Sequence, residues 1–335
     1  MNGSASAPRL SFHCGGAVTA LPTTPIRSRR GRAGAGARSR ADGSMNYRHA
    51  YHAGNFADVV KHVALTRLVE YLKRKEKGFR VIDTHAGPGL YDLASEAARK
   101  TGEWRAGIGR LAAAVLDAGT QARLQAYVDA VQATNPDGEI ANYPGSPLIV
   151  RHLLRSQDRL SAIELNPHDA SSLKSLFAGD HQVRVIRLDG WLALGAHVPP
   201  KEKRGLVLID PPFEEEGEFA RLAGRLQAAY RRWPGGIYAL WYPLKDRTAV
   251  AHFRKALRAT GIPKILDTCF SVRSPSSRLD GSGLVVVNPP FTFENEMRLV
   301  LPALVEVLAE DAGAGWTIEW LTAERPGPGS LPGVA

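Results

Sequence analysis

The distribution of apolar and polar residues divides most of the chain into short strands and amphipathic helices. A helix is predicted after Asn55, because an Asn cap and an acid in the first turn precede apolar residues at helical spacing. Apolar runs that end in polar or glycine-rich corners follow, which is the pattern of buried parallel strands. These predicted strands span 79–83, 160–164, 183–189, 205–210, 237–242, 265–272 and 283–287. Helical patterns lie between most of them, so we expect a doubly wound α/β sheet.

A long stretch between the first two predicted strands shows no strand pattern. Residues 92–140 are rich in Ala, Leu, Arg and Glu and close with the turn sequence Asn135-Pro136-Asp137-Gly138. We expect them to form a small helical subdomain inserted into one main domain that spans 45–322. Residues 323–335 are expected to be a disordered tail.

The first 44 residues differ from the rest in composition. They hold seven Arg, no Lys and one acid, Asp42, and so carry six of the ten net positive charges of the chain. They lack apolar periodicity, so we expect them to be disordered. Three interpretations stay open: an organelle transit peptide, a basic RNA-binding arm, or an upstream extension before a true start at Met45. The third is favoured, because an ordered pattern begins at Met45.

Composition excludes several classes of protein. The 335 residues are 44% hydrophobic, yet no apolar run approaches the roughly 18 residues of a membrane-spanning helix. The two cysteines, Cys14 and Cys269, have no disulfide-framework or zinc-ligand spacing. We therefore expect a cytoplasmic protein without a membrane segment. The mildly basic body is compatible with nucleic acid but does not establish it.

The first candidate site follows the strand that ends at Asp83. Ligands bind beyond the carboxyl ends of strands in open α/β sheets, and the loop from Asp83 to Gly89 contains glycines that let backbone approach a ligand. It contains no Gly-x-Gly-x-x-Gly, and Pro88 removes a donor that a pyrophosphate would need. An NAD-dependent oxidoreductase is therefore disfavoured.

Acids end the next two predicted strands. Glu164 stands where ribose hydroxyls are commonly held by a carboxylate, although it is equally a candidate helix cap. Asp189 and Gly190 form either a ligand contact or an ordinary turn. Ser146, in Tyr143-Pro144-Gly145-Ser146-Pro147, is a further candidate ligand in what is otherwise a turn.

The sharpest feature is the corner Asp210-Pro211-Pro212-Phe213. Consecutive prolines make it stiff, and it presents a carboxylate and carbonyls that can orient the hydrogens of an exocyclic amine. Phe213 offers a face on which a base can stack, the alternative being a rigid turn with a core Phe. The corner resembles the catalytic signature of amino-methyltransferases that use S-adenosylmethionine.

A second copy of the corner, Asn288-Pro289-Pro290-Phe291, follows the last predicted strand. That strand is antiparallel in methyltransferase sheets, so we expect Asn288 at the opposite edge and choose Asp210. His49, His52 and His62 lie close together in the sequence, but their spacing fits no zinc motif, and no metal is expected.

Further motifs occur in order along the chain between Met45 and about Trp320, namely Tyr47-Arg48-His49, His52-Ala53-Gly54-Asn55, Lys61-His62, Asp83-Thr84-His85-Ala86-Gly87, Tyr143-Pro144-Gly145-Ser146-Pro147, Ile209-Asp210-Pro211-Pro212, Tyr238-Ala239-Leu240-Trp241-Tyr242-Pro243 and Asn288-Pro289-Pro290. Together they resemble the bacterial RlmJ family of 23S ribosomal RNA adenine-N6 methyltransferases. Two residues depart from the family pattern, since Phe213 stands where Tyr is common and Phe56 where a relative has His.

The resemblance implies a Rossmann-like class I methyltransferase sheet with an inserted helical subdomain. It implies that Asp210 is the catalytic acceptor and that Tyr47 touches the RNA. It also implies that the methyl donor contacts His62, His85, Ser146, Glu164, Asp189, Gly190 and Asp210.

The expected activity is transfer of a methyl group from S-adenosylmethionine to an adenine turned out of its stack in 23S ribosomal RNA. The expected protein is a monomer without a metal. A DNA adenine methyltransferase and a non-catalytic RNA-binding protein on the same fold are the alternatives.

Overall fold

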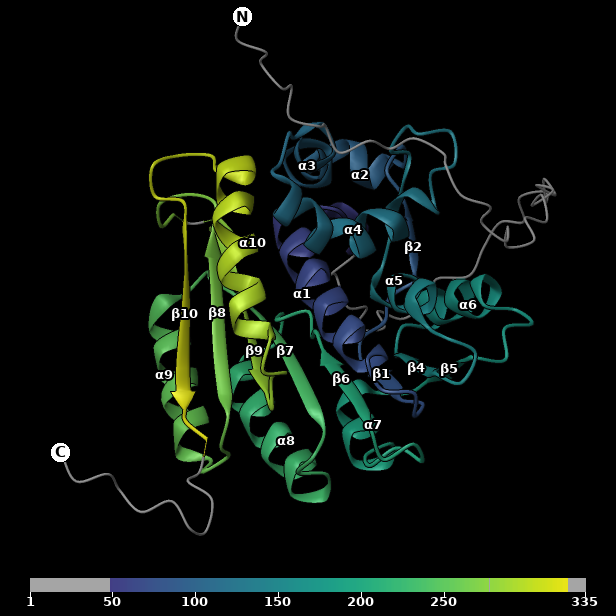
Figure 1. The fold of residues 1–335 in the computed structure, drawn as a ribbon, viewed down its shortest axis with the longest axis vertical. Helices are drawn as coiled ribbons and strands as arrows, with labels where there is room; N and C mark the ends of the chain where they lie inside the picture. The colour runs from purple at the N-terminus through teal and green to yellow at the C-terminus, as the bar shows by residue number, and fades with distance from the viewer. Residues whose placement is uncertain (1–48, 277, 325–335) are drawn as a thin grey trace, which may run out of the picture.

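The computed structural model describes residues 49–276 and 278–324 (Figure 1). The leader, with the proposed start at Met45, lies outside these residues, as do Tyr47, which is predicted to touch the RNA, and the tail from 325. The expectations for those segments stay predictions. In the described ranges, no helix is both long and apolar enough to cross a membrane.

An eight-stranded sheet forms the centre of the fold, with the strand order β10-β8-β9-β7-β6-β1-β4-β5. The strands are β1 (Arg80–Asp83), β4 (Arg159–Glu164), β5 (Val183–Arg187), β6 (Gly205–Ile209), β7 (Ile237–Pro243), β8 (Ile265–Ser271), β9 (Gly281–Val287) and β10 (Gly315–Thr322). The strands from β7 to β5 are parallel, β9 is antiparallel to β7 and β8, and β10 is antiparallel to β8. The predicted doubly wound α/β sheet is confirmed.

Helices cover both faces of the sheet, which explains why the inner strands β6 and β7 are almost continuously apolar. The helices are α1 (Phe56–Lys73), α5 (Ser146–Leu153), α6 (Pro167–Leu176), α7 (Gly190–Ala196), α8 (Glu218–Arg232), α9 (Arg247–Ala259) and α10 (Phe293–Leu308). One core joins the sheet to α1, α5, α6 and α10, and a second core joins its other face to α7, α8 and α9.

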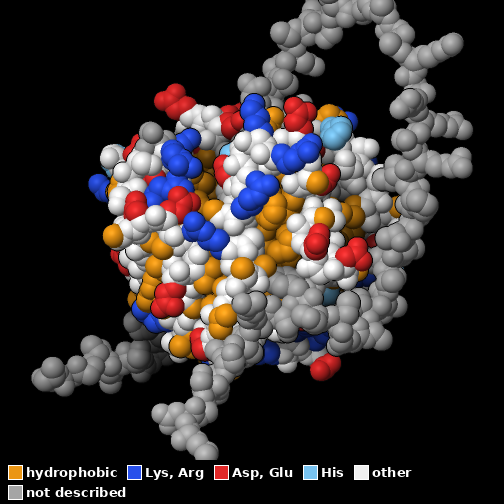
Figure 2. Space-filling view, turned by 90° about the horizontal axis from the view of Figure 1, so that it is seen from above, with side chains coloured by type: hydrophobic (Ala, Val, Ile, Leu, Met, Phe, Trp, Pro, Cys, Tyr) orange, Lys and Arg blue, Asp and Glu red, His pale blue; other side chains and the backbone are white. Residues whose placement is uncertain are grey.

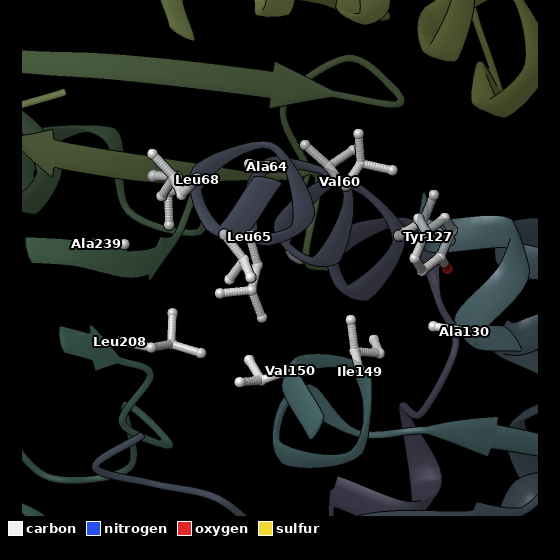
Figure 3. Close-up of a cluster of buried hydrophobic side chains, with 14 of the residues drawn as sticks. Val60, Ala64, Leu65, Leu68, Tyr127, Ala130, Ile149, Val150, Leu208 and Ala239 are labelled. Atoms are coloured by element: carbon white, nitrogen blue, oxygen red, sulfur yellow. The ribbon is translucent and has the colours of Figure 1, made fainter. Parts of the chain in front are cut away.

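Helix α1 is the centre of the first core, because it is apolar on almost every side. Figure 3 shows Leu65 and Leu68 of α1 above Leu208 of β6 and Ala239 of β7, with Val150 of α5 nearby. This packing fixes α1 across the sheet. Its first turns, which carry the polar residues, therefore lie at the carboxyl edge of β6.

The segment 92–140, interpreted as an insertion, is mainly helical. It contains α2 (Glu96–Thr101), a π-helical turn (Arg105–Gly109), α3 (Arg110–Ala113) and α4 (Ala118–Gln132). Two short strands that the sequence did not predict pair at its two ends, with β2 (Leu90–Asp92) antiparallel to β3 (Asn142–Pro144). The buried side chains of α4 belong to the same core as α1.

Two further details differ from the prediction. The third predicted strand ends at Arg187 and not at Asp189, because Asp189 leaves the sheet to cap α7. Strand β10 was not predicted, because it lies at the edge of the sheet and its half-exposed residues lack a clean alternation.

Candidate active site

A cavity of about 1190 Å³ opens at the carboxyl edge of the parallel strands. β1 and β6 are neighbours there, but the chain continues from β1 to β4 on one side and from β6 to β7 on the other. Such a switch point is where α/β proteins bind ligands. Every predicted site residue within the described ranges lines the cavity, namely His62, His85, Ser146, Glu164, Asp189, Gly190, Asp210 and Phe213.

The exit of β1 combines a buried carboxyl with a neutral histidine. Asp83 is fully buried, and burial raises its pKa to about 7 against the hydrogen bond that Ser146 Oγ donates at 2.6 Å. His85 Nδ1 lies 2.8 Å from Thr84 Oγ1, and burial lowers the pKa of His85 to about 4. His85 is therefore uncharged near neutral pH, and the Ser146 hydroxyl is held by Asp83.

Glu164 joins the ends of β1 and β4. Its Oε2 accepts a hydrogen bond from the Gly87 amide at 2.8 Å, and its Oε1 accepts one from the Asn166 amide at 2.7 Å. Asn166, and not Glu164, caps α6 with its side chain. Burial raises the pKa of Glu164. The carboxylate therefore shapes the glycine loop beside the cavity.

Asp189 and Gly190 hold α7 against the loop after β1. Asp189 Oδ1 accepts a hydrogen bond from the Trp191 amide at 2.7 Å and caps the helix. A Cβ on Gly190 would lie 2.2 Å from the Thr84 carbonyl oxygen and 2.9 Å from the His85 ring. Only glycine permits this approach, so the turn and the cavity wall require the same residue.

A buried chain of charges leads to Asp210. Lys61 Nζ donates to Asp210 Oδ2 at 2.6 Å and to Asp58 Oδ1 at 2.8 Å, and all three side chains are largely buried. Asp58 Oδ2 contacts His49 Nε2 and the Gly54 amide, each at 3.0 Å. Burial opposes the charge of Asp58, but His49 and Lys61 hold its pKa well below the ordinary value. Burial likewise opposes the charge of Lys61, but Asp210 and Asp58 raise its pKa.

Aromatic rings surround this carboxylate. Phe213 has a left-handed backbone conformation with φ of 52°, which is uncommon for a residue other than glycine. Its ring lies 4.9 Å from that of Phe219 and 5.9 Å, edge-on, from that of Trp241. Lys61 Nζ lies 6.0 Å from the Trp241 ring. Phe213 is half-buried and lines the cavity, so it does not lie inside the hydrophobic core.

The three histidines near the start of the described chain have different partners. His52 Nδ1 lies 3.0 Å from Glu103, and His62 Nδ1 lies 2.8 Å from the Tyr143 hydroxyl, whereas His49 contacts Asp58. Burial lowers the pKa of His62 well below its ordinary value. Across residues 49–276 and 278–324, no three His, Cys, Asp or Glu side chains gather as metal ligands.

The second proline corner lies at the opposite edge of the sheet, as predicted. β9 is antiparallel to β7, so Asn288 emerges beside the start of β7. Its Nδ2 donates to the carbonyls of Pro234 and Gly236 at 2.7 and 2.8 Å. Asn288 is therefore a turn residue far from the cavity.

Three residues of the site were not selected from the sequence. Asp58 and Lys61 were placed on one helix face with His62 but were given no role, and Trp241 appeared only within a resembling motif. The sequence feature that could have singled out Lys61 is a lysine at a helix position surrounded by apolar residues. Its contact with Asp210, 149 positions away, could be found only from the fold.

One side of the cavity fits S-adenosylmethionine. This donor carries a sulfonium and an ammonium against one carboxylate, and this side of the cavity is acidic: Glu164, Asp169, Asp189, Glu214, Glu215 and Glu218 line it, with Arg221 as the neighbouring cation. His62 Nε2 is buried and has no hydrogen-bond partner within the described part of the chain. Gly190 leaves the backbone accessible there. The residues present therefore match the donor in charge and shape.

Comparisons with known proteins agree with this geometry. The family model described as "Ribosomal RNA large subunit methyltransferase D, RlmJ" matches residues 76–322. Proteins named Ribosomal RNA large subunit methyltransferase J are 43% identical over 283 residues in Haemophilus influenzae and 42% identical over 282 residues in Escherichia coli. Each alignment covers 84% of this chain and 100% of the relative. A crystal structure of a Legionella pneumophila protein is 33% identical, with a TM-score of 0.73 over 80% of this chain and 98% of that one. The predicted Rossmann-like class I fold is confirmed.

Proposed function

Because this chain belongs to the RlmJ family of ribosomal RNA large subunit methyltransferases, we propose that it methylates the exocyclic N6 amine of an adenine in 23S ribosomal RNA. The observation that carries the choice of atom is the carboxylate of Asp210 at the exit of β6, beside the rings of Phe213 and Trp241. A carboxylate accepts N–H groups, and the rings match the faces of a base.

Asp210 is positioned for this role by Lys61. Lys61 engages Oδ2 at 2.6 Å, while Oδ1 has no hydrogen bond in the described part of the chain and is free to accept one from the adenine amine. The lone pair of an adenine amine is delocalised into the ring. An acceptor on one of its hydrogens favours the pyramidal geometry in which nitrogen can attack. Asp58, fixed by His49 and Gly54, holds Lys61 in place.

S-adenosylmethionine supplies an electrophilic methyl group when it is bound. Glu164 is placed to hold hydroxyl groups, and Asp189 and Gly190 border the same acidic side. His62 Nε2 has no hydrogen-bond partner in the described part of the chain and can bond the methyl donor. His85 is neutral and packs edge-on to Trp191, with ring centroids 5.3 Å apart, so it adds a wall without adding positive charge.

The target base must leave its stack to reach Asp210, since that side chain is only 15% exposed. Unpaired or loop adenines would reach it at the lowest cost. We expect the enzyme to act in the cytoplasm, as a monomer without a metal. A DNA adenine is the rival substrate, because Asp210 would contact the amine and not the sugar.

Mass spectrometry of modified nucleosides tests the proposal. The protein is incubated with S-adenosylmethionine and either a 23S ribosomal RNA transcript or duplex DNA. We expect methylated adenine in the RNA and none in the DNA, and we expect Asp210→Asn to abolish it while the protein stays folded, because Asp58 still pairs with Lys61. Product formed by Asp210→Asn at the wild-type rate, or methylation of DNA alone, would contradict the proposal.

A further inference from the structure

The mouth of the cavity has a basic side that the chemistry at its floor does not use. Lys245, in the turn after β7, and Arg278, in the loop between β8 and β9, both line the cavity and are exposed. Within 49–276 and 278–324, neither pairs with a carboxylate, whereas the neighbouring Arg273 pairs with Glu310. Two exposed cations therefore stand at the opening without a salt bridge among the described residues.

The charge of Arg278 acts on Glu103, which follows α2, and the charge of Lys245 acts on His52, in the turn before α1. The pKa of Glu103 lies below its ordinary value, because hydrogen bonds from His52 and Asn55 and the charge of Arg278 together outweigh burial. The pKa of His52 is raised chiefly by its hydrogen bond to Glu103, and the charge of Lys245 opposes that rise. Both loops thus border the same gap.

Charges are unevenly distributed around the cavity. The side assigned to the methyl donor is lined by carboxylates such as Asp189 and Glu214, which repel phosphate. Lys245 and Arg278 lie on the side where β7 and β8 end, with Glu103 as a neighbouring carboxylate. In the view from above the strand ends, Figure 2 shows Lys and Arg side chains on this face among hydrophobic, Asp and Glu side chains. A polyanionic strand is therefore favoured over the side that carries Lys245 and Arg278.

We propose that Lys245 and Arg278 bind phosphates of the RNA strand that flanks the target adenine, so that the strand crosses the mouth over the β7–α9 and β8–β9 loops. This rests on the proposed function. Phosphate contacts position a nucleic acid without reading its sequence. Here they set the direction from which the base enters, with the base directed toward Asp210 and the backbone kept away from the acidic loop after Phe213.

Filter binding of a 23S ribosomal RNA transcript at several salt concentrations tests the inference. Each phosphate contact contributes about 0.7–0.9 to the slope of log affinity against log salt. The double variant Lys245→Ala/Arg278→Ala should therefore reduce the magnitude of this slope by about 1.4–1.8. It should weaken binding roughly 20- to 60-fold at 0.1 M salt. The KM for RNA should rise in parallel, while S-adenosylmethionine affinity and melting temperature should stay at the wild-type values.

Two matched variants complete the experiment. Lys245→Arg/Arg278→Lys keeps both charges and should keep the salt slope. Lys201→Ala/Arg231→Ala removes the same two charges from exposed positions at the opposite edge, before β6 and at the end of α8, and should bind RNA as the wild type does. An unchanged slope in the Lys245/Arg278 alanine variant, or an equal loss in the Lys201/Arg231 variant, overturns the inference. A wild-type protein that binds the transcript but never methylates it contradicts the proposed function and leaves the binding comparison intact.

Discussion

Replacing Lys61 with Met should both destabilise the protein and stop methyl transfer. The substitution keeps the volume of the side chain but removes a charge that is 5% exposed and lies 2.8 and 2.6 Å from two carboxylates. Removing one partner of a buried ion pair costs about 3–5 kcal/mol, because the remaining charge is left uncompensated. At about 2 °C per kcal/mol, the melting temperature should therefore fall by roughly 6–10 °C.

The loss should depend on pH in a definite direction. The wild-type pKa of Asp58 is depressed, so its contribution to stability is present above about pH 4 and is lost only as the pH falls through the folded value. Without Lys61, burial is opposed mainly by His49 and the pKa of Asp58 should rise. In mild acid, protonation of Asp58 then removes the uncompensated charge, and the variant loses less stability. The difference in melting temperature between wild type and Lys61→Met should therefore be larger at pH 8 than at pH 5.

Two companion variants separate this explanation from simple loss of packing. Lys73→Met makes the same change on the same helix, but the pair that Lys73 forms with Glu70 is about 30% exposed and open to water, so it should cost less than about 1 kcal/mol. Asp58→Asn/Lys61→Met removes both charges and should recover part of the lost stability without recovering activity. Differential scanning calorimetry and transfer of a labelled methyl group measure the two properties. Equal losses in Lys61→Met and Lys73→Met, or no recovery in the double variant, would refute the reasoning.

Three further outcomes are expected. Phe213→Ala should reduce turnover by roughly five- to 150-fold, the value of about 1–3 kcal/mol of base stacking, while Phe213→Tyr keeps most of it; a large fall in melting temperature for Phe213→Ala would instead assign the ring to packing. Gly190→Ala should weaken S-adenosylmethionine binding at least tenfold by calorimetry, because its Cβ would meet the Thr84 carbonyl at 2.2 Å; wild-type affinity would show that the loop gives way. Asp83→Asn should gain stability relative to wild type as the pH rises from about 4 to about 7, since folding holds a proton on Asp83 up to a pKa of about 7; parallel curves of melting temperature against pH would contradict this.

The sequence predicted most of the sheet because most of its strands are buried on both faces. The seven predicted strands correspond to β1, β4, β5, β6, β7, β8 and β9, with ends that differ by a residue or two. β5 is only partly buried, but its Val and Ile residues still indicated a strand. The other strands without full burial were missed. β10 exposes part of both faces, and the paired strands β2 and β3 are too short to show a period.

The site residues that could be predicted are those that strand topology places. Glu164 and Asp210 follow parallel strands, so one edge of the sheet collects them. Lys61 could not be placed in this way. A Lys three positions after Asp58 is usually an exposed helix pair, and the pair is buried only because the apolar residues around it draw the whole of α1 into the core.

The two proline corners show why a motif alone does not define this active site. Asp210-Pro211-Pro212-Phe213 and Asn288-Pro289-Pro290-Phe291 are equally stiff, and each follows a fully buried strand. They differ in strand direction, because β6 runs parallel to its neighbours and β9 runs against them. Phe213 therefore lines the cavity, whereas Phe291 is 80% exposed and meets Tyr71 edge-on. The Asn288 side-chain amide donates to two backbone carbonyls, whereas Asp210 Oδ1 has no hydrogen bond in the described part of the chain. Two similar sequences thus form a turn at one edge of the sheet and, in the proposed function, a receptor for an amine at the other.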